Sequence, residues 1–253
     1  MRLSNRRTIV TGAADGIGRA IATAFADEGA IVIAFDLDRP KAEAFAAEVT
    51  AKGGKAIAVQ GSVASASDVE GLLARADEEF GGVDILVNNA GVSGNMPSLE
   101  LTDEFWDRVI GIDLTGVFRC SRAAGRRMIA QGSGIIINIA SIFGDLAAPA
   151  RLAYCAAKAG VCSMTKVLAI EWATHGIRVN AVAPGYIQTA LVDDLVAKGR
   201  LDIEPLRRRT PMRRLGTPKE IADLCVFLAT REAAFITGQI YAVDGGWSAY
   251  GHI

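Results

Sequence analysis

Seven short apolar runs, rich in β-branched residues, alternate along the chain with longer segments rich in Ala, Glu, Lys and Arg. Most of the runs are continuous rather than alternating, which is typical of parallel strands buried on both faces. Strands that alternate with helices indicate βαβ units, so we expect an α/β fold. The predicted strands are 8–13, 30–36, 55–61, 83–91, 134–141, 177–185 and 238–246, and the predicted helices are 17–28, 41–52, 68–80, 103–131 and 152–175.

The chain contains no internal repeat, low-complexity tract or Ser/Pro-rich linker, so we expect residues 1–253 to form a single domain. The pattern predicts a doubly wound, mostly parallel seven-stranded sheet with helices on both faces. The polar segment 188–217 breaks this rhythm and is interpreted as a substrate lid, because such sheets bind ligands beyond the carboxyl ends of their strands. Its arginines either recognise a carboxylate or phosphate, or pair with Asp193, Asp194, Asp202 and Glu204.

Composition restricts the possible partners. The formal net charge is -1, which gives no global field that would attract nucleic acid or an anionic membrane. The four cysteines, Cys120, Cys155, Cys162 and Cys225, show no paired spacing and indicate reduced thiols without a metal site. We see neither a signal-peptide pattern nor an apolar run of the ~20 residues needed to cross a bilayer. We therefore expect a soluble, cytoplasmic protein.

The stretch TGAADGIG follows the first predicted strand and opens the first helix. Gly12, Gly16 and Gly18 would let the backbone turn tightly and approach a pyrophosphate at the helix N-terminus. The spacing is GxxxGxG rather than GxGxxG, and a purely structural turn is the alternative. Asp36 ends the second strand, where a carboxylate accepts hydrogen bonds from ribose hydroxyls and repels a 2′-phosphate. Asp15 adds a second negative charge, so the sequence favours NAD over NADP.

Ser141, Tyr154 and Lys158 form a candidate catalytic set. Ser141 closes an apolar run and should lie at the carboxyl edge of a strand, while Tyr154 and Lys158 share one face of the next helix. A phenol has an ordinary pKa of about 10, and a neighbouring ammonium favours its phenolate, so the pair can act as a general base. A Tyr-Lys pair alone usually reflects packing, but three such residues after a nucleotide loop favour catalysis, with Ser141 holding the substrate oxygen.

With these residues in place, the sequence resembles the short-chain dehydrogenase/reductase family over essentially the whole chain. The motifs that carry the resemblance are TGAADGIG (11–18), NNAG (88–91), Ser141 with YCAAK (154–158), PGYIQT (184–189) and VDGG (243–246). The resemblance implies a Rossmann-type domain in which a hydride passes between a nicotinamide ring and a carbinol carbon. It also implies a homotetramer in which the long helices 103–131 and 152–175 pair between subunits.

The resemblance further implies the residues that bind the cofactor. Lys158 would bond the nicotinamide ribose, and Ile187 and Thr189 would hold the carboxamide, while Asn88 would lie near the adenosine. The complete expected set is Gly12, Asp15, Gly16, Ile17, Gly18, Asp36, Leu37, Ser62, Val63, Asn88, Asn89, Ala90, Gly91, Tyr154, Lys158, Pro184, Gly185, Ile187 and Thr189.

Two positions depart from the pattern that is usual in this family. The segment GIDLTG places Asp113 where Asn is common. An Asp can still interrupt a helix through local side-chain bonds, so its backbone can still hold the water of a proton relay. The side-chain N–H donor that an Asn would provide is lost. We retain Asp113 as the fourth candidate catalytic residue. Ser62 stands where an adenine-binding Asp is common, and it can accept the same hydrogen bond more weakly.

The substrate is expected to contact the region between Ser141 and Tyr154, the turn after residue 91, and the lid. The candidates are Ser93, Ser141, Phe143, Arg151 and Tyr186, with Ile142, Asp145 and Leu191 beside them. An apolar wall combined with groups that bond hydroxyls suits a polyol, a sugar or a cyclic secondary alcohol. We therefore predict an NAD-dependent dehydrogenase. The alternatives are an NADPH-dependent reductase of 3-oxoacyl groups on a carrier protein, and a non-catalytic NAD(H)-sensing protein.

Overall fold

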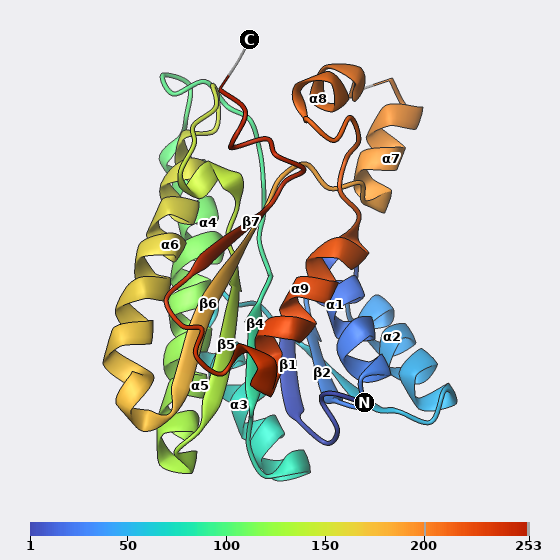
Figure 1. Cartoon of the computed structure of the whole chain (residues 1–253), viewed down its shortest axis with the longest axis vertical. Helices are drawn as coiled ribbons and strands as arrows, with labels where there is room; N and C mark the ends of the chain where they lie inside the picture. Colours follow the sequence, from blue (N-terminus) through green and yellow to red (C-terminus); the bar gives the residue numbers. More distant parts are fainter. Residues whose placement is uncertain (200, 252–253) are drawn as a thin grey trace.

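The computed structural model describes residues 1–199 and 201–251, without the side chain of Leu191. It confirms the predicted architecture, with seven parallel strands in the order β3-β2-β1-β4-β5-β6-β7 (Figure 1). The strands are shorter than their apolar runs because several runs continue into the loops at the carboxyl edge. Their bounds are β1 Arg7–Thr11, β2 Ile31–Asp36, β3 Lys55–Gln60, β4 Ile85–Asn88, β5 Gly134–Ile139, β6 Ile177–Pro184 and β7 Ile240–Val243.

Helices cover both faces of the sheet, as the continuous apolar strands require. Alternate strand residues point to opposite faces, so Val10 and Val32 enter one core while Ile9 and Ile33 enter the other. The first core packs against α1 (Gly16–Asp27), α2 (Arg39–Ala51) and α9 (Pro218–Ala229). The second core packs against α3 (Ala66–Phe80), α5 (Val117–Gln131) and α6 (Leu152–Trp172), an arrangement visible in Figure 1.

The helix predicted over 103–131 is divided into three parts. It begins as α4 (Asp103–Ile110), widens into one π-helical turn over Gly111–Gly116, and continues as α5. Asp113 lies within the π turn, which confirms the predicted interruption, but its side chain bonds Val92 on a distant segment rather than its own helix. A π turn changes the direction of side chains relative to the helix on either side, and such turns occur frequently at functional sites.

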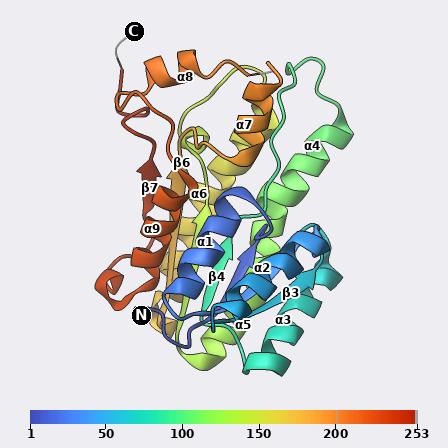
Figure 2. The ribbon, with the colours of Figure 1, turned by 90° about the vertical axis from the view of Figure 1, so that its right-hand side faces the viewer.

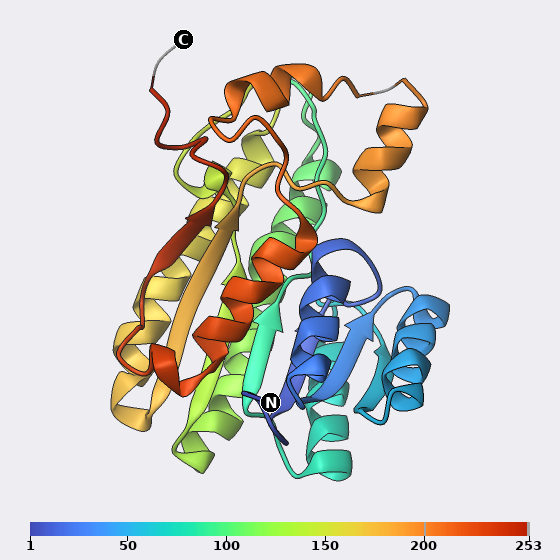
Figure 3. The same ribbon diagram turned by 45° about the vertical axis from the view of Figure 1, so that its right-hand side comes forward.

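The carboxyl ends of the strands face the segment predicted as a lid. Residues Ala190–Ala197 form α7 and Glu204–Arg209 form α8, and both lie beyond the end toward which the strand arrows point (Figures 2 and 3). A parallel bridge between Ile187 and Gly216 closes the base of this insertion. Because β1 pairs with both β2 and β4, the chain reverses its direction of winding there, and open α/β sheets bind ligands at such a reversal.

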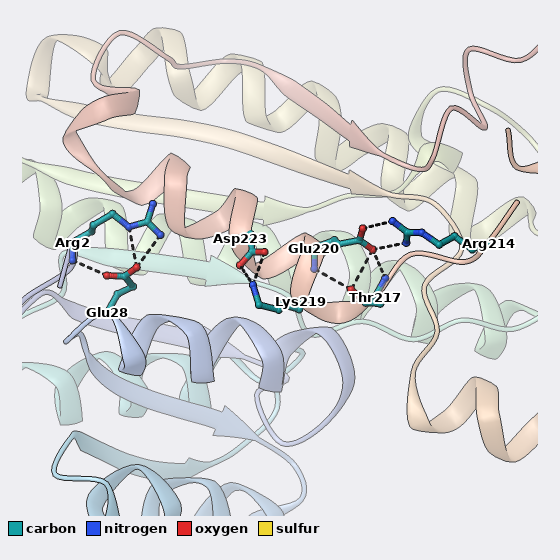
Figure 4. Close-up of polar contacts among 7 residues, drawn as sticks. All are labelled: Arg2, Glu28, Arg214, Thr217, Lys219, Glu220 and Asp223. Carbon is teal, nitrogen blue, oxygen red and sulfur yellow. Dashed lines mark hydrogen bonds and ion pairs between the residues drawn. The ribbon is translucent and has the colours of Figure 1, made fainter. Parts of the chain in front are cut away.

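Ion pairs hold the insertion together and connect it to α9. Two nitrogens of the Arg214 guanidinium bind Glu220 at 2.9 and 2.6 Å, and Glu220 also accepts the backbone N–H of Thr217 (Figure 4). The Arg214 guanidinium is the main reason that the pKa of Glu220 falls to about 2. Arg207 binds Glu204 at 2.7 Å. The predicted pairing of the lid arginines with acidic residues of the lid is therefore confirmed for Arg207, which binds Glu204. Arg214 is also paired, but with Glu220, which was not among the predicted partners.

The expectation that no segment is long and apolar enough to cross a bilayer is wrong for α6. The helix and its short continuation, Leu152–His175, are long and apolar enough by length and composition alone. A core helix of a soluble protein passes the same test, and α6 packs along β6 and beside the short helix Ile142–Gly144. In this structure 33% of the apolar window is buried, and it includes exposed apolar residues such as Ile170.

Arg7 and Asp84 connect the beginnings of β1 and β4 at the opposite edge of the sheet. The guanidinium of Arg7 donates to both oxygens of Asp84, at 2.8 and 2.7 Å, and the Arg7 backbone N–H adds a third bond. Both side chains are largely covered, at 22% and 12% exposure. Burial opposes ionisation of Asp84, but the bonds from Arg7 prevail and hold the pKa of that carboxyl below its usual range.

We predict that Asp84→Asn lowers the free energy of unfolding by about 2 kcal/mol near pH 7, because a mostly covered guanidinium loses its counter-charge. Since the folded pKa of Asp84 is depressed, its contribution is present above the unfolded value of about 4 and is lost as pH falls through the folded pKa. The wild-type advantage should therefore shrink below about pH 4, as measured by denaturant unfolding.

The matched control is Asp223→Asn, which removes the carboxylate of an exposed pair with Lys219 (Figure 4). Exposed pairs contribute about 0–1 kcal/mol, so this variant should unfold nearly like the wild type. Equal losses in the two variants would contradict the assigned role of the Arg7–Asp84 pair.

Candidate active site

A cleft of about 570 Å³ opens at the carboxyl ends of β1 and β4, where the winding of the chain reverses. It is formed by the glycine-rich loop after β1, the end of β2, the turn after β3 and the turn after β4. Of the residues expected to bind the cofactor, this cleft brings together Gly12, Asp15, Gly16, Ile17, Gly18, Asp36, Leu37, Ser62, Val63, Asn89, Ala90, Gly91 and Thr189. Five segments, the fifth being the turn that holds Thr189, therefore face one cavity.

The glycines of the loop are required by the space around them. A Cβ atom at Gly18 would lie 2.0 Å from the carbonyl oxygen of Gly12, so no larger residue fits. Gly12 has φ = 65° and lies so close to Ala90 that a Cβ atom would be 2.9 Å from its Cα. The loop leads directly into α1, whose first N–H groups have no partners within the helix. This cradle fits the pyrophosphate of a dinucleotide.

Thr11 and Asn89 hold the loop in this shape, a role that the sequence interpretation missed for Thr11. The Thr11 hydroxyl accepts the N–H groups of Asn89 and Ala90 at 3.0 and 3.1 Å. The Asn89 amide donates in return to the carbonyls of Thr11 and Gly12, both at 3.0 Å. The T-G and N-N-A-G motifs therefore hold each other in place. In the sequence, only the presence of both motifs could have indicated this contact.

Asp36 lies at the cleft with both carboxylate oxygens fixed by backbone. The N–H of Ala14 donates to one oxygen and the N–H of Asp38 donates to the other, each at 2.9 Å. These bonds orient the carboxylate and leave its remaining lone pairs available for ribose hydroxyls. The Asp38 side chain accepts the N–H of Lys41, so Asp38 caps α2.

Asp15 does not simply add a second negative charge to the cleft, as the sequence suggested, because it is paired with a lysine. Lys41, which the sequence analysis overlooked, places its ammonium 3.0 Å from the Asp15 carboxylate and lines the same cleft. The hydrogen bond from Lys41, followed by that from the N–H of Gly16, holds the pKa of Asp15 below its usual range. Lys41 therefore offsets the charge of Asp15, and the carboxylates of Asp36 and Asp38 line the same cleft.

Asn88 is not placed to contact a cofactor, contrary to expectation. Its side chain is buried and donates to Ser121 Oγ and to Asn138 Oδ1, both at 2.9 Å. Asn138 in turn donates to Thr165 on α6 at 2.9 Å. This polar network joins β4, β5, α5 and α6 behind the cleft, because successive residues of a strand point to opposite faces and Asn89 takes the open one.

Lys158 is buried at 4% exposure and is surrounded by the other catalytic candidates. Its ammonium lies 3.2 Å from the carboxylate of Asp113 and donates to the carbonyl of Ile139, at the end of β5, at 3.1 Å. The same ammonium lies 5.5 Å from the centroid of the Tyr154 ring. Three of the four predicted catalytic residues therefore meet around one buried positive charge.

Asp113 is fully buried and makes two contacts with distinct roles. One carboxylate oxygen accepts the N–H of Val92 at 2.8 Å, while the other has only the ion pair with Lys158 as a partner among the described residues. Burial raises the pKa of Asp113, against the opposing effects of the Lys158 charge and the Val92 N–H. The π turn is what brings this side chain to the ammonium.

Ser141 starts the short helix Ile142–Gly144, and its hydroxyl oxygen accepts the N–H of Phe143 at 3.2 Å. Ser141 therefore shapes the turn after β5, while its hydroxyl hydrogen can still donate to a substrate oxygen. The short helix packs so closely on α6 that a Cβ atom at Gly144 would lie 3.1 Å from the carbonyl oxygen of Lys158. The segment carrying Ser141 is therefore fixed against the helix that carries Tyr154 and Lys158.

Two of the predicted substrate residues, Phe143 and Tyr186, pack together and are called the aromatic wall. The rings of Phe143 and Tyr186 meet edge to face with centroids 6.2 Å apart, and Arg151 lies 5.1 Å from the centroid of Phe143. Ser93 is exposed on the turn after β4. Pro184 ends β6, and Gly185 and Ile187 follow it. None of the three lines the cleft of the glycine loop, so their contacts to a nicotinamide stay predictions. The side chain of Leu191 lies outside the described residues.

Known proteins resemble this chain over nearly its full length. Residues 12–248 match the family model described as enoyl-(acyl carrier protein) reductase. A 3-oxoacyl-[acyl-carrier-protein] reductase of Synechocystis is 44% identical over 96% of this chain and 97% of its own length. The cis-4-hydroxycyclohexanecarboxylate dehydrogenase of Sinomonas cyclohexanicum is 44% identical over 97% and 98%. A crystal structure of gluconate 5-dehydrogenase from Burkholderia cenocepacia with NADP and tartrate is 35% identical, with coverage of 98% and 97% and a TM-score of 0.92.

The contact between Asp113 and Lys158 leads to a prediction about pH dependence. In Asp113→Asn, the ammonium beside Tyr154 loses its compensating charge, which favours the phenolate form of the tyrosine. The pH at which kcat/KM for alcohol oxidation is half-maximal should then fall by about one unit, as determined from a pH–rate profile. Asp107→Asn, which removes an exposed carboxylate from α4, should leave the profile in place. A midpoint that rises or stays unchanged in Asp113→Asn would refute the assigned charge compensation.

Proposed function

The chain belongs to the short-chain dehydrogenase/reductase family, oxidoreductases that act on CH–OH groups, and from this premise we propose that it transfers a hydride between NAD and a secondary alcohol or ketone. The observation that carries the proposal is the buried ammonium of Lys158, held between Asp113, the end of β5 and the ring of Tyr154. Burying an ammonium costs desolvation free energy, which its partners offset only in part. Buried charges beside a candidate base are therefore typical of functional sites.

The residues of the chain then have separate tasks. Ser141 donates its hydroxyl hydrogen to the substrate oxygen and fixes the carbinol at the carboxyl edge of β5. Tyr154 takes the hydroxyl proton during oxidation and returns it during reduction, and Lys158 stabilises the phenolate. When bound, NAD supplies the acceptor for the hydride that leaves the same carbon. Asp113 holds Lys158 in place and sets the charge around it.

We infer NAD rather than NADP from Asp36. Its carboxylate is oriented by two backbone N–H groups at the end of β2, where ribose hydroxyls would be read and a 2′-phosphate repelled. The solved gluconate 5-dehydrogenase that resembles this chain contains NADP. The inference of NAD for this chain therefore depends on Asp36, the residue at the end of β2.

Within this class, we propose a polyol, a sugar-type substrate or a cyclic secondary alcohol. The names of two relatives support it, because gluconate is a polyhydroxy acid and 4-hydroxycyclohexanecarboxylate is a cyclic alcohol. The rival is reduction of 3-oxoacyl groups on a carrier protein with NADPH, which the name of the Synechocystis relative favours and Asp36 disfavours. A purely sensing role would not require Tyr154 and Lys158 together.

We also propose a cytoplasmic homotetramer. Val167 and Ile170 on α6 and Phe118 on α5 are apolar and exposed, at 48%, 78% and 42%. Exposed apolar residues on neighbouring helices support burial against a second copy.

Tyr154→Phe tests the proposed chemistry. Loss of the phenolic hydroxyl should lower kcat for alcohol oxidation about 10²- to 10⁴-fold, because the proton has no acceptor, while the dissociation constant for NADH changes less than about threefold. Steady-state kinetics and NADH fluorescence measure the two quantities. Tyr241→Phe, on β7, serves as the control and should retain activity. Full activity in Tyr154→Phe would exclude this mechanism.

A further inference from the structure

We propose that Arg151 binds a carboxylate of the substrate, so that the alcohol oxidised by this protein is a hydroxy acid. The guanidinium of Arg151 lies over the ring of Phe143, three residues before Tyr154. The inference rests on the proposed function, because it assigns a second recognition point in the same substrate pocket. It narrows the substrate class from secondary alcohols in general to anionic ones.

The position of Arg151 in the chain places it beside the catalytic groups. Arg151 is the residue immediately before α6, and Tyr154 and Lys158 follow it by three and seven positions. Tyr154 and Lys158 share one face of α6, and Arg151 precedes its first turn. Side chains of a helix lean toward its N-terminus, so Tyr154 leans toward Arg151. Arg151 and Tyr154 are therefore three residues apart at the beginning of α6, and we infer that one substrate reaches both.

The aromatic wall holds the guanidinium without using its hydrogen bonds. Phe143 follows Ser141 by two residues and is buried at 7% exposure, and its ring carries the Arg151 guanidinium on one side and the edge of Tyr186 on another. A guanidinium stacked on a ring keeps its in-plane N–H groups free for a carboxylate. Among the described residues, no hydrogen bond or ion pair engages the guanidinium of Arg151.

The helix itself gains nothing from a positive charge at this end. A cation at a helix N-terminus opposes the helix dipole, and acidic residues are preferred there. The first turn of α6 has no acidic residue, and Arg151 makes no side-chain capping bond. Recognition of an anion gives this placement a function, because the guanidinium and the N-terminal end of the helix attract the same charge.

The arginines of the lid, which the sequence analysis considered for anion binding, are mostly engaged elsewhere. Arg209 donates to the carbonyls of Trp247 and Tyr250 and stacks on both rings. Arg207 and Arg214 form the ion pairs described above. Within the part of the chain that the structure describes, no hydrogen bond or ion pair engages the guanidinium of Arg208. Arg208 is therefore the alternative carboxylate-binding residue against which Arg151 is compared.

The experiment compares two substrates that differ only in charge, cis-4-hydroxycyclohexanecarboxylate and the corresponding neutral carboxamide. We would measure kcat/KM with NAD for the wild type and for Arg151→Gln, Arg151→Lys and Arg208→Gln. Calorimetry with cyclohexanecarboxylate and the NADH-bound protein gives a second readout that does not need turnover.

We expect Arg151→Gln to lower kcat/KM for the carboxylate about 30- to 100-fold, the effect of losing a charge-assisted bidentate contact. Activity with the carboxamide should change less than about twofold, which also shows that the variant is folded. Arg151→Lys should recover part of the loss, because a point charge replaces the planar fork. Arg208→Gln should match the wild type. An equal loss on both substrates, or a carboxylate-specific loss in Arg208→Gln instead, overturns the proposal.

We call the proposed carboxylate contact at Arg151 the anchor. Failure of the proposed function gives a different result from failure of the anchor. If the wild type oxidises neither compound, the calorimetric experiment decides: binding of cyclohexanecarboxylate that is at least tenfold weaker in Arg151→Gln supports the anchor. Equal binding by the wild type and Arg151→Gln overturns it.

Discussion

The buried ammonium of Lys158 is the constraint on which the active site depends. A charge at 4% exposure must be compensated locally, and three separate segments provide the compensation. The end of β5 supplies the carbonyl of Ile139, the π turn supplies the carboxylate of Asp113, and α6 supplies the ring of Tyr154. The sheet order and the interruption of the long helix at Gly111–Gly116 are both required for these groups to meet.

The same arrangement links the two halves of the proposed reaction. The Thr11–Asn89 bonds fix the glycine loop where a cofactor would bind, and Asn88, the next residue back, joins the polar network that reaches α6 through Asn138. The cofactor cleft and the proton-transferring residues are thus held by adjacent residues of one strand end.

The sequence predicted the strand and helix order, the glycine loop and the Ser141–Tyr154–Lys158 set, because apolar periodicity and motif spacing are local properties. It could not distinguish Asn88 from Asn89, since that depends on which face of β4 each residue takes. Nor could it pair Asp15 with Lys41, which lie 26 residues apart. The partner of Asp113 depends on a π turn, for which the residues 111–116 give no periodic signal.

We propose that Asp36 binds the ribose hydroxyls of NAD and thereby sets the cofactor preference of this oxidoreductase. Titrating the purified protein with NADH and NADPH side by side, followed by nicotinamide fluorescence, tests it most directly. We expect NADH to bind at least about tenfold more tightly, because the fixed carboxylate of Asp36 repels a 2′-phosphate. Equal or tighter binding of NADPH would contradict it, would make Lys41 the dominant charge at the cleft, and would favour reduction of carrier-bound 3-oxoacyl groups.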